Sequence, residues 1–259
     1  AMALGYIVGV ALFRFSKSWI ITYILAELAA VAYLLIKGDV LKCNPFKPSP
    51  YFKSNLNSSL TLIATNLLTS VIANIDRPLI LKFVDANSVT VFYIATLIGK
   101  IIALLTAPLN GVIISYLAKY DGKLSRKTFT NICAVSLIGV SLLSLICIFV
   151  SYIFVKIMYP NVYLQAKPLI PVAITGQIFY FMSGTLMVVL MRFTKERLQF
   201  VVNGIYFAVY MAASIYALDN GGLHGFAIAV LFANAFRMAL TYLFGMVELK
   251  KENKGDKHN

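Results

Sequence analysis

Long uninterrupted apolar runs constrain this chain more than any other feature of its sequence. A run of about 20 apolar residues is long enough to span the hydrocarbon core of a bilayer as a helix. Backbone groups in lipid must be hydrogen-bonded within the chain, so each run is predicted to be a transmembrane helix. Eight such runs are read from the sequence, at about residues 1–13, 18–37, 56–83, 89–118, 128–156, 168–191, 198–218 and 223–248. The chain is therefore predicted to be an all-α, polytopic transmembrane bundle.

The composition agrees with this prediction. Hydrophobic residues make up 60% of the chain and charged residues 13%, and the mean hydropathy is +0.82. A soluble domain is closer to half apolar and a quarter charged. The net charge of +13 would suggest a nucleic-acid partner in a soluble protein, but in a membrane protein its meaning depends on where the charges lie. The predicted partner is the lipid bilayer, with no nucleic acid.

The basic residues of the chain cluster in alternate loops. Basic residues concentrate in cytoplasmic loops, so this pattern places the C-terminus in the cytoplasm of a multi-pass protein. One missed or extra helix would disrupt the alternation, which supports the number of predicted spans. The four clusters are Lys42/Lys47/Lys53, Lys119/Lys123/Arg126/Lys127, Arg192/Lys195/Arg197 and Lys250/Lys251/Lys254/Lys257.

Five sequence segments, in order, resemble one known family. Asn74–Pro78 (NIDRP) ends one apolar run, and the next run begins with Val91-Phe92-Tyr93 and contains Lys100 and Pro108. Downstream come MYPNVYLQAKP at 158–168, LMRFTKERLQFVV at 190–202 and GGLHGFAIA at 221–229. In this order and spacing they resemble the polysaccharide (Wzx-type) flippases of the multidrug/oligosaccharidyl-lipid/polysaccharide exporter superfamily. The resemblance covers roughly Lys53 to Leu249.

The resemblance implies a two-lobed, MATE-like exporter fold. Residues 1–37 would be the last two helices of the N-lobe, 38–55 a cytoplasmic linker and 56–249 a complete six-helix C-lobe. Residues 250–259 are expected to form a disordered cytoplasmic tail, because they are polar and charged. Such a chain is expected to be a fragment of a longer protein.

The implied function is transport of a lipid. A polyprenyl-diphosphate-linked oligosaccharide would be flipped across a bacterial or archaeal cytoplasmic membrane by alternating access between lobes. This step belongs to polysaccharide or lipopolysaccharide biosynthesis, so polysaccharide-assembly proteins are possible further partners.

One face of the 89–118 span carries small and polar side chains around a single cation. At about 100° per residue this face contains Tyr93, Thr96, Lys100, Ala103, Ala107 and Gly111. Small residues on one face also favour close helix packing. A lone ammonium facing lipid is costly, so Lys100 is predicted to face a central cavity and attract the diphosphate.

The 56–83 span carries two adjacent polar stripes, so it is predicted to face other helices or water. The stripes are Ser58/Thr65/Thr69/Asp76 and Ser59/Asn66/Ser70/Arg77. Arg77 would help attract the diphosphate, while Asn66 and Ser70 would contact sugar or water. Asp76 would orient a cation, couple to ion movement or form a structural ion pair with a neighbouring helix. Asn66 and Asp76 are both expected to avoid lipid.

Two further charges lie deep in predicted spans. Arg237 is about 14 residues from the outer end of its span, or roughly 21 Å deep at 1.5 Å per residue. It is predicted either to bind the diphosphate, which suits the planar guanidinium, or to pair with Asp76 or Glu27. Glu27 is predicted to pair with a cation or to be a protonation site. Lys100 and Arg237 are expected to converge on one aqueous cavity.

The sequence contains no enzyme signature. It has no glycine-rich phosphate loop, no Ser/His/Asp arrangement and only two histidines. The three cysteines lack metal-binding spacing, so no catalytic residue, metal or cofactor is predicted. Three alternatives stay open: a cation-coupled multidrug exporter of the same superfamily, a membrane glycosyltransferase or polymerase, and a non-transporting scaffold. The first would favour acidic cavity residues and the second a large outer loop, whereas here the deep charges are mostly basic and the outer loops short.

Overall fold

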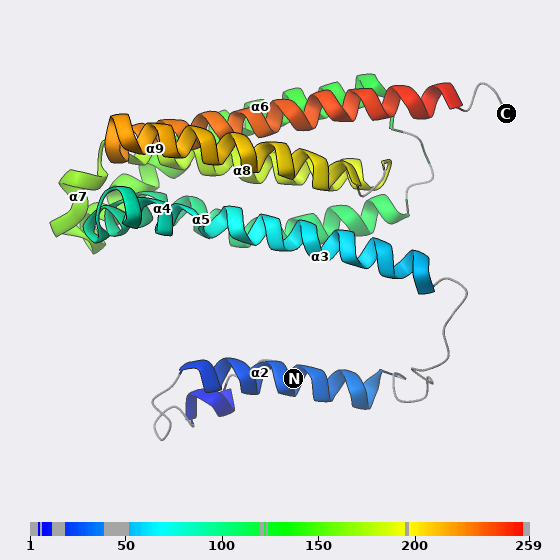
Figure 1. The fold of residues 1–259 in the computed structure, drawn as a ribbon, viewed down its shortest axis with the longest axis horizontal. Helices are drawn as coiled ribbons and strands as arrows, with labels where there is room; N and C mark the ends of the chain where they lie inside the picture. Colours follow the sequence, from blue (N-terminus) through cyan, green and yellow to red (C-terminus); the bar gives the residue numbers. More distant parts are fainter. Residues whose placement is uncertain are drawn as a thin grey trace. The chain divides into compact units, whose positions relative to one another are not determined.

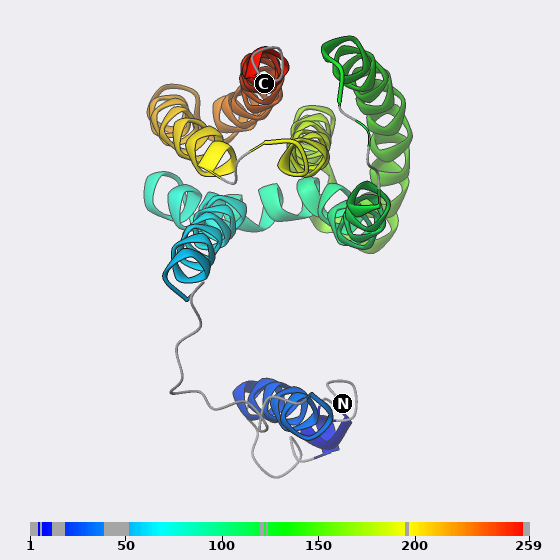
Figure 2. The same cartoon turned by 90° about the vertical axis from the view of Figure 1, so that its right-hand side faces the viewer.

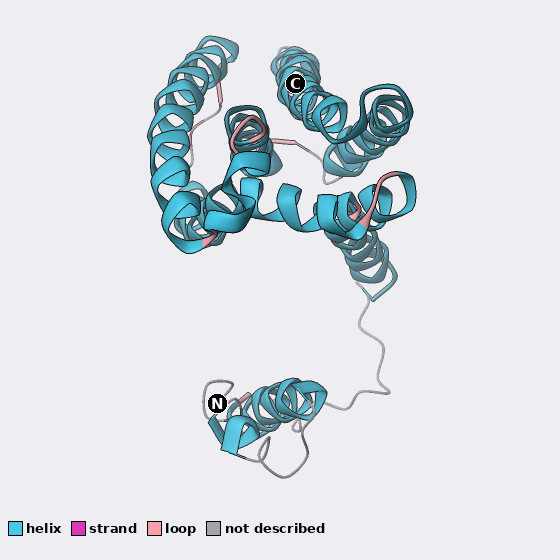
Figure 3. Cartoon of the chain, turned by 90° about the vertical axis from the view of Figure 1, so that its left-hand side faces the viewer, coloured by secondary structure: helices cyan, strands magenta, loops and turns pink. Residues whose placement is uncertain are grey.

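The computed structural model describes residues 5, 7–11, 19–38, 52–119, 122, 124–194 and 197–255. Helices account for nearly all of these residues, and none of them lies in a strand (Figure 3). The all-α prediction is therefore confirmed. The chain forms two compact units, residues 1–56 and 57–259, and each is described by itself. Most of the linker predicted at 38–55 lies outside the described residues.

The first unit contains α2, Trp19–Lys37, packed against the helical residues 7–11. The hydroxyl of Thr22 donates to the carbonyl oxygen of Gly9 at 3.1 Å. A Cβ atom on Gly9 would lie 2.7 Å from the Cα of Thr22, and one on Gly5 would lie 2.6 Å from the Cα of Ala26. Glycines spaced four residues apart thus let the two backbones approach closely, as small residues do between membrane helices.

The second unit is a bundle of long helices joined by short connections. Six described helices in the whole chain are long and apolar enough to cross a membrane, by length and composition. Five of them are in this bundle, and their ends alternate between its two ends (Figure 1). The elements are α3 Phe52–Asn74, α4 Asp76–Phe83, α5 Ala86–Ala118, α6 Arg126–Met158, α7 Pro160–Ala166, α8 Ile170–Met191 and α9 Arg197–Gly255.

The last element, α9, is two antiparallel segments that meet at a sharp reversal. Gly222 has φ 54° and ψ −145°, a non-helical conformation that glycine adopts without steric cost. Hydrogen bonds join Asn203 to Arg237 and Tyr206 to Asn234, so the two segments lie side by side. They correspond to the spans predicted at 198–218 and 223–248. The second segment continues to Gly255, so the prediction of a disordered tail was wrong for residues 250–255; residues 256–259 lie outside the described part.

The span predicted at 56–83 is broken into α3 and α4 at Ile75. Pro78 explains the position of the break, because its nitrogen has no hydrogen to donate to the carbonyl of Asn74. Asp76 therefore opens a new helix instead of continuing the old one. Pro108, by contrast, lies inside α5 without ending it.

The core of the second unit surrounds α8, which packs against α5, α6 and α9 (Figure 2). Ile170, Ile174 and Ile178 recur every four residues on its buried face and are at most 1% exposed. At one end of the bundle lie the end of α5, the beginning of α6, the end of α8 and both ends of α9 (Figure 1). Basic residues gather at this end of the bundle, which we call the basic end. They are Lys119, Arg126, Lys127, Arg192, Arg197 and Lys250.

Candidate functional site

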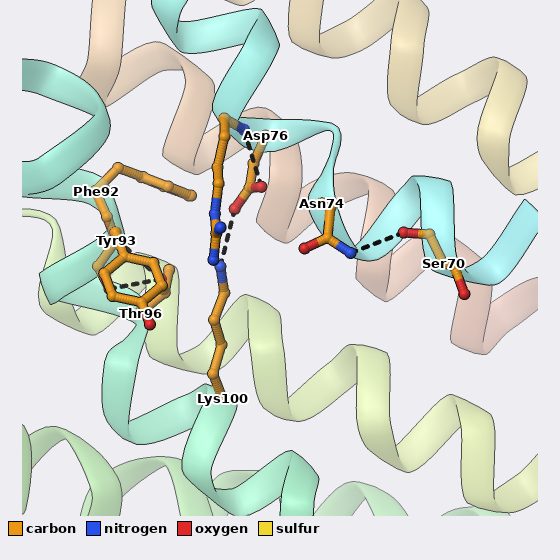
Figure 4. Close-up of polar contacts among 8 residues, drawn as sticks. Ser70, Asn74, Asp76, Phe92, Tyr93, Thr96 and Lys100 are labelled. Atoms are coloured by element: carbon orange, nitrogen blue, oxygen red, sulfur yellow. Dashed lines mark hydrogen bonds and ion pairs between the residues drawn. The ribbon is translucent and has the colours of Figure 1, made fainter. Parts of the chain in front are cut away.

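A buried carboxylate and a lysine pair at the break between α3 and α4. Asp76, the first residue of α4, is 5% exposed. One carboxylate oxygen accepts from the ammonium of Lys100 on α5 at 3.1 Å, and the other accepts from the backbone N–H of Arg77 at 2.9 Å (Figure 4). The helix break thus gives the carboxylate a backbone donor as well as a charged partner. The prediction that Asp76 avoids lipid holds in this structure, and so does its interpretation as an ion-pair partner of a neighbouring helix.

Two cations share one aromatic ring beside this carboxylate. The guanidinium carbon of Arg77 lies 4.9 Å from the ring centre of Tyr93, and the Nζ of Lys100 lies 5.1 Å from it. The negative face of an aromatic ring attracts cations at such distances. Because only one carboxylate accompanies two cations, this cluster carries one excess positive charge and is suited to an anion.

The cluster opens into a cavity of about 190 Å³ between α3, α4, α5, α8 and α9. Lys100, Asp76 and Arg77 line it together with side chains that can donate or accept hydrogen bonds. The others of this kind are Asn74, Gln177, Tyr180, Tyr206, Tyr210 and Asn234. A few placed polar groups among aromatic walls are typical of a ligand site, here one for a small anionic or polyhydroxylated group.

Arg237 lies behind the aromatic wall of this cavity. Its guanidinium donates to the carbonyl of Tyr180 at 3.0 Å, to the hydroxyl of Ser183 at 3.1 Å and to the amide oxygen of Asn203 at 3.1 Å. The guanidinium carbon also lies 4.4 Å from the ring centre of Tyr180 and 5.3 Å from that of Tyr206. The residue is 5% exposed and is not part of the cavity lining. The expected convergence of Lys100 and Arg237 on one cavity is wrong in this structure, because two tyrosines stand between them.

The expected pairing of Arg237 with Asp76 is wrong as well. Asp76 pairs with Lys100 instead, and no carboxylate among the described residues of the second unit lies within ion-pair distance of Arg237. Neutral oxygens and aromatic rings stabilise the guanidinium in their place. Glu27, the other predicted partner, is exposed on α2 of the first unit, and its pairing with Arg237 stays a prediction.

The network around Arg237 connects three helices. Tyr206 donates to the amide oxygen of Asn234, whose nitrogen donates to the carbonyl of Gly176 at 2.9 Å. The amide of Asn203 reaches the hydroxyl of Thr69 on α3 at 3.4 Å. The sequence reasoning missed these residues. Their spacing in the sequence could have indicated a polar helix face, because Asn203, Tyr206, Tyr210 and Ser214 recur every three or four residues. In the structure this face is buried.

The two predicted sugar-binding residues of α3 do not line the cavity. Asn66 and Ser70 are exposed on the surface of the second unit. The carbonyl of Ser70 accepts from the amide of Asn74 at 3.0 Å, which is visible in Figure 4. The expectation that Asn66 faces other helices is thus not met within this unit. Together with Asn74 and Arg77 these side chains form an exposed polar stripe that leads to the cavity.

No protein-family model, curated protein or solved structure matches this chain. The described residues include no cluster of three or more histidine, cysteine or acidic side chains that could hold a metal.

Proposed function

We propose that this protein is a membrane transporter of MATE-like fold that flips a polyprenyl-diphosphate-linked oligosaccharide across the cytoplasmic membrane. Transport would proceed by alternating access, with the described bundle as the C-lobe and the C-terminus in the cytoplasm. The observation that carries the proposal is the cavity at the α3–α4 break, where two cations and one carboxylate meet inside a bundle of membrane-length helices.

The excess positive charge supports an anionic substrate. Arg77 and Lys100 both reach the cavity, and diphosphate oxygens would replace the water and part of the ion pair around them. Arg suits such oxygens because its planar guanidinium donates two parallel hydrogen bonds. A cation-coupled multidrug exporter would need a free carboxylate here, whereas Asp76 already accepts from Lys100.

The hydrogen-bonding side chains support a sugar-bearing headgroup. Gln177, Asn234 and the tyrosine hydroxyls can exchange hydrogen bonds with sugar hydroxyls, and the rings offer apolar faces for sugar carbons. In the proposed mechanism the exposed polar stripe of α3 offers water or sugar contacts during passage, as predicted for Asn66 and Ser70. Arg237 holds the wall and does not touch the substrate.

The test is complementation of polysaccharide export in cells lacking their own flippase. Lys100→Ala is expected to reduce export at least tenfold, because it removes the attraction for the diphosphate. Lys100→Arg is expected to retain more activity, because it keeps the charge. Membrane levels of each variant are measured in parallel.

Lys156→Ala is the matched control, because Lys156 is an exposed cation of α6 outside the cavity lining. It should export as the unmodified protein does. Normal export by Lys100→Ala would refute the anion site. Drug resistance conferred by the chain, without export of polysaccharide, would favour the multidrug exporter.

A further inference from the structure

A second cavity lies between α6, α8 and the second segment of α9, and its lining is almost entirely apolar. It measures about 460 Å³, larger than the charged cavity, and shares no lining residue with it. Three alanines, Ala134, Ala235 and Ala239, leave the space that larger side chains would fill. The remaining lining is Thr130, Cys133, Leu137, Phe179, Leu186, Met238 and Tyr242. We call this cavity the apolar groove.

The apolar groove has a polar end. Thr130 lies within 3.4 Å of the hydroxyl of Tyr242 and 3.8 Å of the sulfur of Met246. The two helices are antiparallel, so the residues that follow this contact toward the basic end are Arg126 on α6 and Lys250 on α9. The groove thus changes from apolar walls to hydroxyl groups and then to cations.

Helical periodicity places these cations on the helix faces that form the groove. On α6, Arg126, Thr130, Cys133 and Leu137 are spaced by four, three and four residues, which is one helical face. On α9, Ala239, Tyr242, Met246 and Lys250 follow the same rule. Arg126, its neighbour Lys127 and Lys250 are exposed. Glu248 lies about 120° from Tyr242 on the helical wheel, outside this face.

We propose that the apolar groove binds an anionic phospholipid, with one acyl chain along the alanines and the phosphate at Arg126, Lys127 and Lys250. From the alanines toward the basic end, the groove changes from apolar to polar to positively charged. A phospholipid changes in the same order, from its acyl chains to its anionic headgroup. The groove-lining part of α6, from Thr130 to Leu137, is about 10 Å long, which fits within one leaflet of a hydrocarbon core about 30 Å thick. The site is independent of the proposed flippase activity and requires only insertion in a membrane.

The separation of the two cavities favours a resident lipid over the transported one. A flipped substrate must bring its headgroup to Lys100, whereas the polar end of the groove leads to the basic end of the bundle. The two cavities are lined by different residues of α8, Gln177 and Tyr180 in one and Phe179 and Leu186 in the other. A bound phospholipid would fill the space between α6 and α9 that their own side chains leave open.

The test is native mass spectrometry of the purified full chain titrated with phosphatidylglycerol or phosphatidylcholine of identical acyl chains. The unmodified protein should retain phosphatidylglycerol more tightly. Arg126→Gln and Lys250→Gln should each weaken it about fivefold, because a basic residue near an anionic lipid surface contributes about 1 kcal/mol. Lys156→Gln, at the other end of α6, should leave it unchanged. Equal affinity for both lipids, or no effect of the two groove variants, would overturn the proposal.

The tail of the lipid is tested separately. Ala239→Phe fills the groove from an exposed position and should lower the retention of both phospholipids, and Leu137→Trp, at another exposed position of the lining, should act in the same way. Unchanged retention in both variants would place the lipid elsewhere. Displacement of phosphatidylglycerol by equimolar polyprenyl phosphate would show that the groove holds the transported lipid, contrary to the proposal.

Discussion

Lys100 serves two partners in the proposed mechanism, the carboxylate of Asp76 and the anionic substrate. Asp76→Asn removes the competing charge while an amide oxygen can still accept from the backbone of Arg77. Coupled charges in one network typically interact by about 0.5–3 kcal/mol. We therefore expect Asp76→Asn to bind a polyprenyl-diphosphate sugar about tenfold more tightly than the unmodified protein in equilibrium binding. Weaker binding would instead mean that Asp76 orients Lys100 toward the ligand.

Arg237 is expected to be essential for stability. Arg237→Ala removes a donor from buried oxygens of Tyr180, Ser183 and Asn203, and each buried polar group left unsatisfied costs about 1–3 kcal/mol. Arg237→Lys should recover little, because an ammonium cannot reproduce the planar fork between two rings. Thermal unfolding in detergent measures both, with Lys156→Ala as the surface control. A variant that unfolds normally but fails to bind substrate would restore the ligand role.

The sequence located the charges of the site but could not assign their partners. Helical periodicity was enough to predict that Lys100 faces a cavity, because the expense of a lipid-facing ammonium holds in any arrangement of helices. The partners of Arg237 come from α8 and the other segment of α9, far along the chain. Which oxygens approach a guanidinium depends on how these helices pack, and periodicity within one helix carries no information about that.

At the scale of elements, the reversal in α9 depends on the closeness of its two segments. A Cβ atom on Gly225 would lie 2.8 Å from the carbonyl oxygen of Ala217, which is backbone and cannot move aside easily. Gly225→Ala is therefore expected to destabilise the protein by about 1–3 kcal/mol, the usual cost of overpacking. Gly221→Ala meets open space and is the matched control. Equal unfolding temperatures for the two variants would contradict this account of the reversal.

The beginning of α5 depends on a charged cap. The backbone N–H of Ser88 donates to the carboxylate of Asp85 at 2.6 Å, and this hydrogen bond lowers the pKa of Asp85 below its ordinary value of 3.8. A lowered pKa means that the stabilisation is present above the ordinary value and is lost as the pH falls through the lowered one. Asp85→Asn keeps a cap without a charge. Unfolding temperatures below about pH 4 should fall more steeply in the unmodified protein than in Asp85→Asn, and parallel curves would rule out this contribution.

Element boundaries followed from the sequence where the apolar pattern was strong. The spans read at 128–156 and 168–191 differ from α6 and α8 by two residues at most. The break at Ile75 lies three residues before Pro78, the proline that causes it. The hydrogen bond that Pro78 cannot donate would join it to the carbonyl of Asn74, one helical turn toward the N-terminus. The short helix α7 lies between two of the predicted spans and was not predicted, since seven residues are too few for a periodic pattern.

For the whole molecule, the grouping of basic residues at one end of the bundle is expected to set its orientation. Basic loops stay on the cytoplasmic side, so a single cysteine at Lys123 should resist a membrane-impermeant thiol reagent in intact cells. One at Asn161, between α6 and α8, should react. Both are placed in a background without Cys43, Cys133 and Cys147. The reverse labelling would invert the proposed topology, and permeabilised cells give the control for reactivity at Lys123.

The neutral surroundings of Arg237 have an electrical consequence. Moving one elementary charge across the full membrane changes its energy by about 2.3 kcal/mol per 100 mV. The Asp76–Lys100 pair has no net charge and is indifferent to voltage, whereas Arg237 has no counter-charge among the described residues of the second unit. The charged diphosphate gives the transport rate some voltage dependence in any variant, but if the lobe moves along the membrane normal, the rate in proteoliposomes should vary more steeply with the imposed voltage in the unmodified protein than in Arg237→Gln. Equal voltage dependence in the two proteins would mean that this charge stays at constant depth, so that one buried side chain reports whether the lobe moves through the field or turns within it.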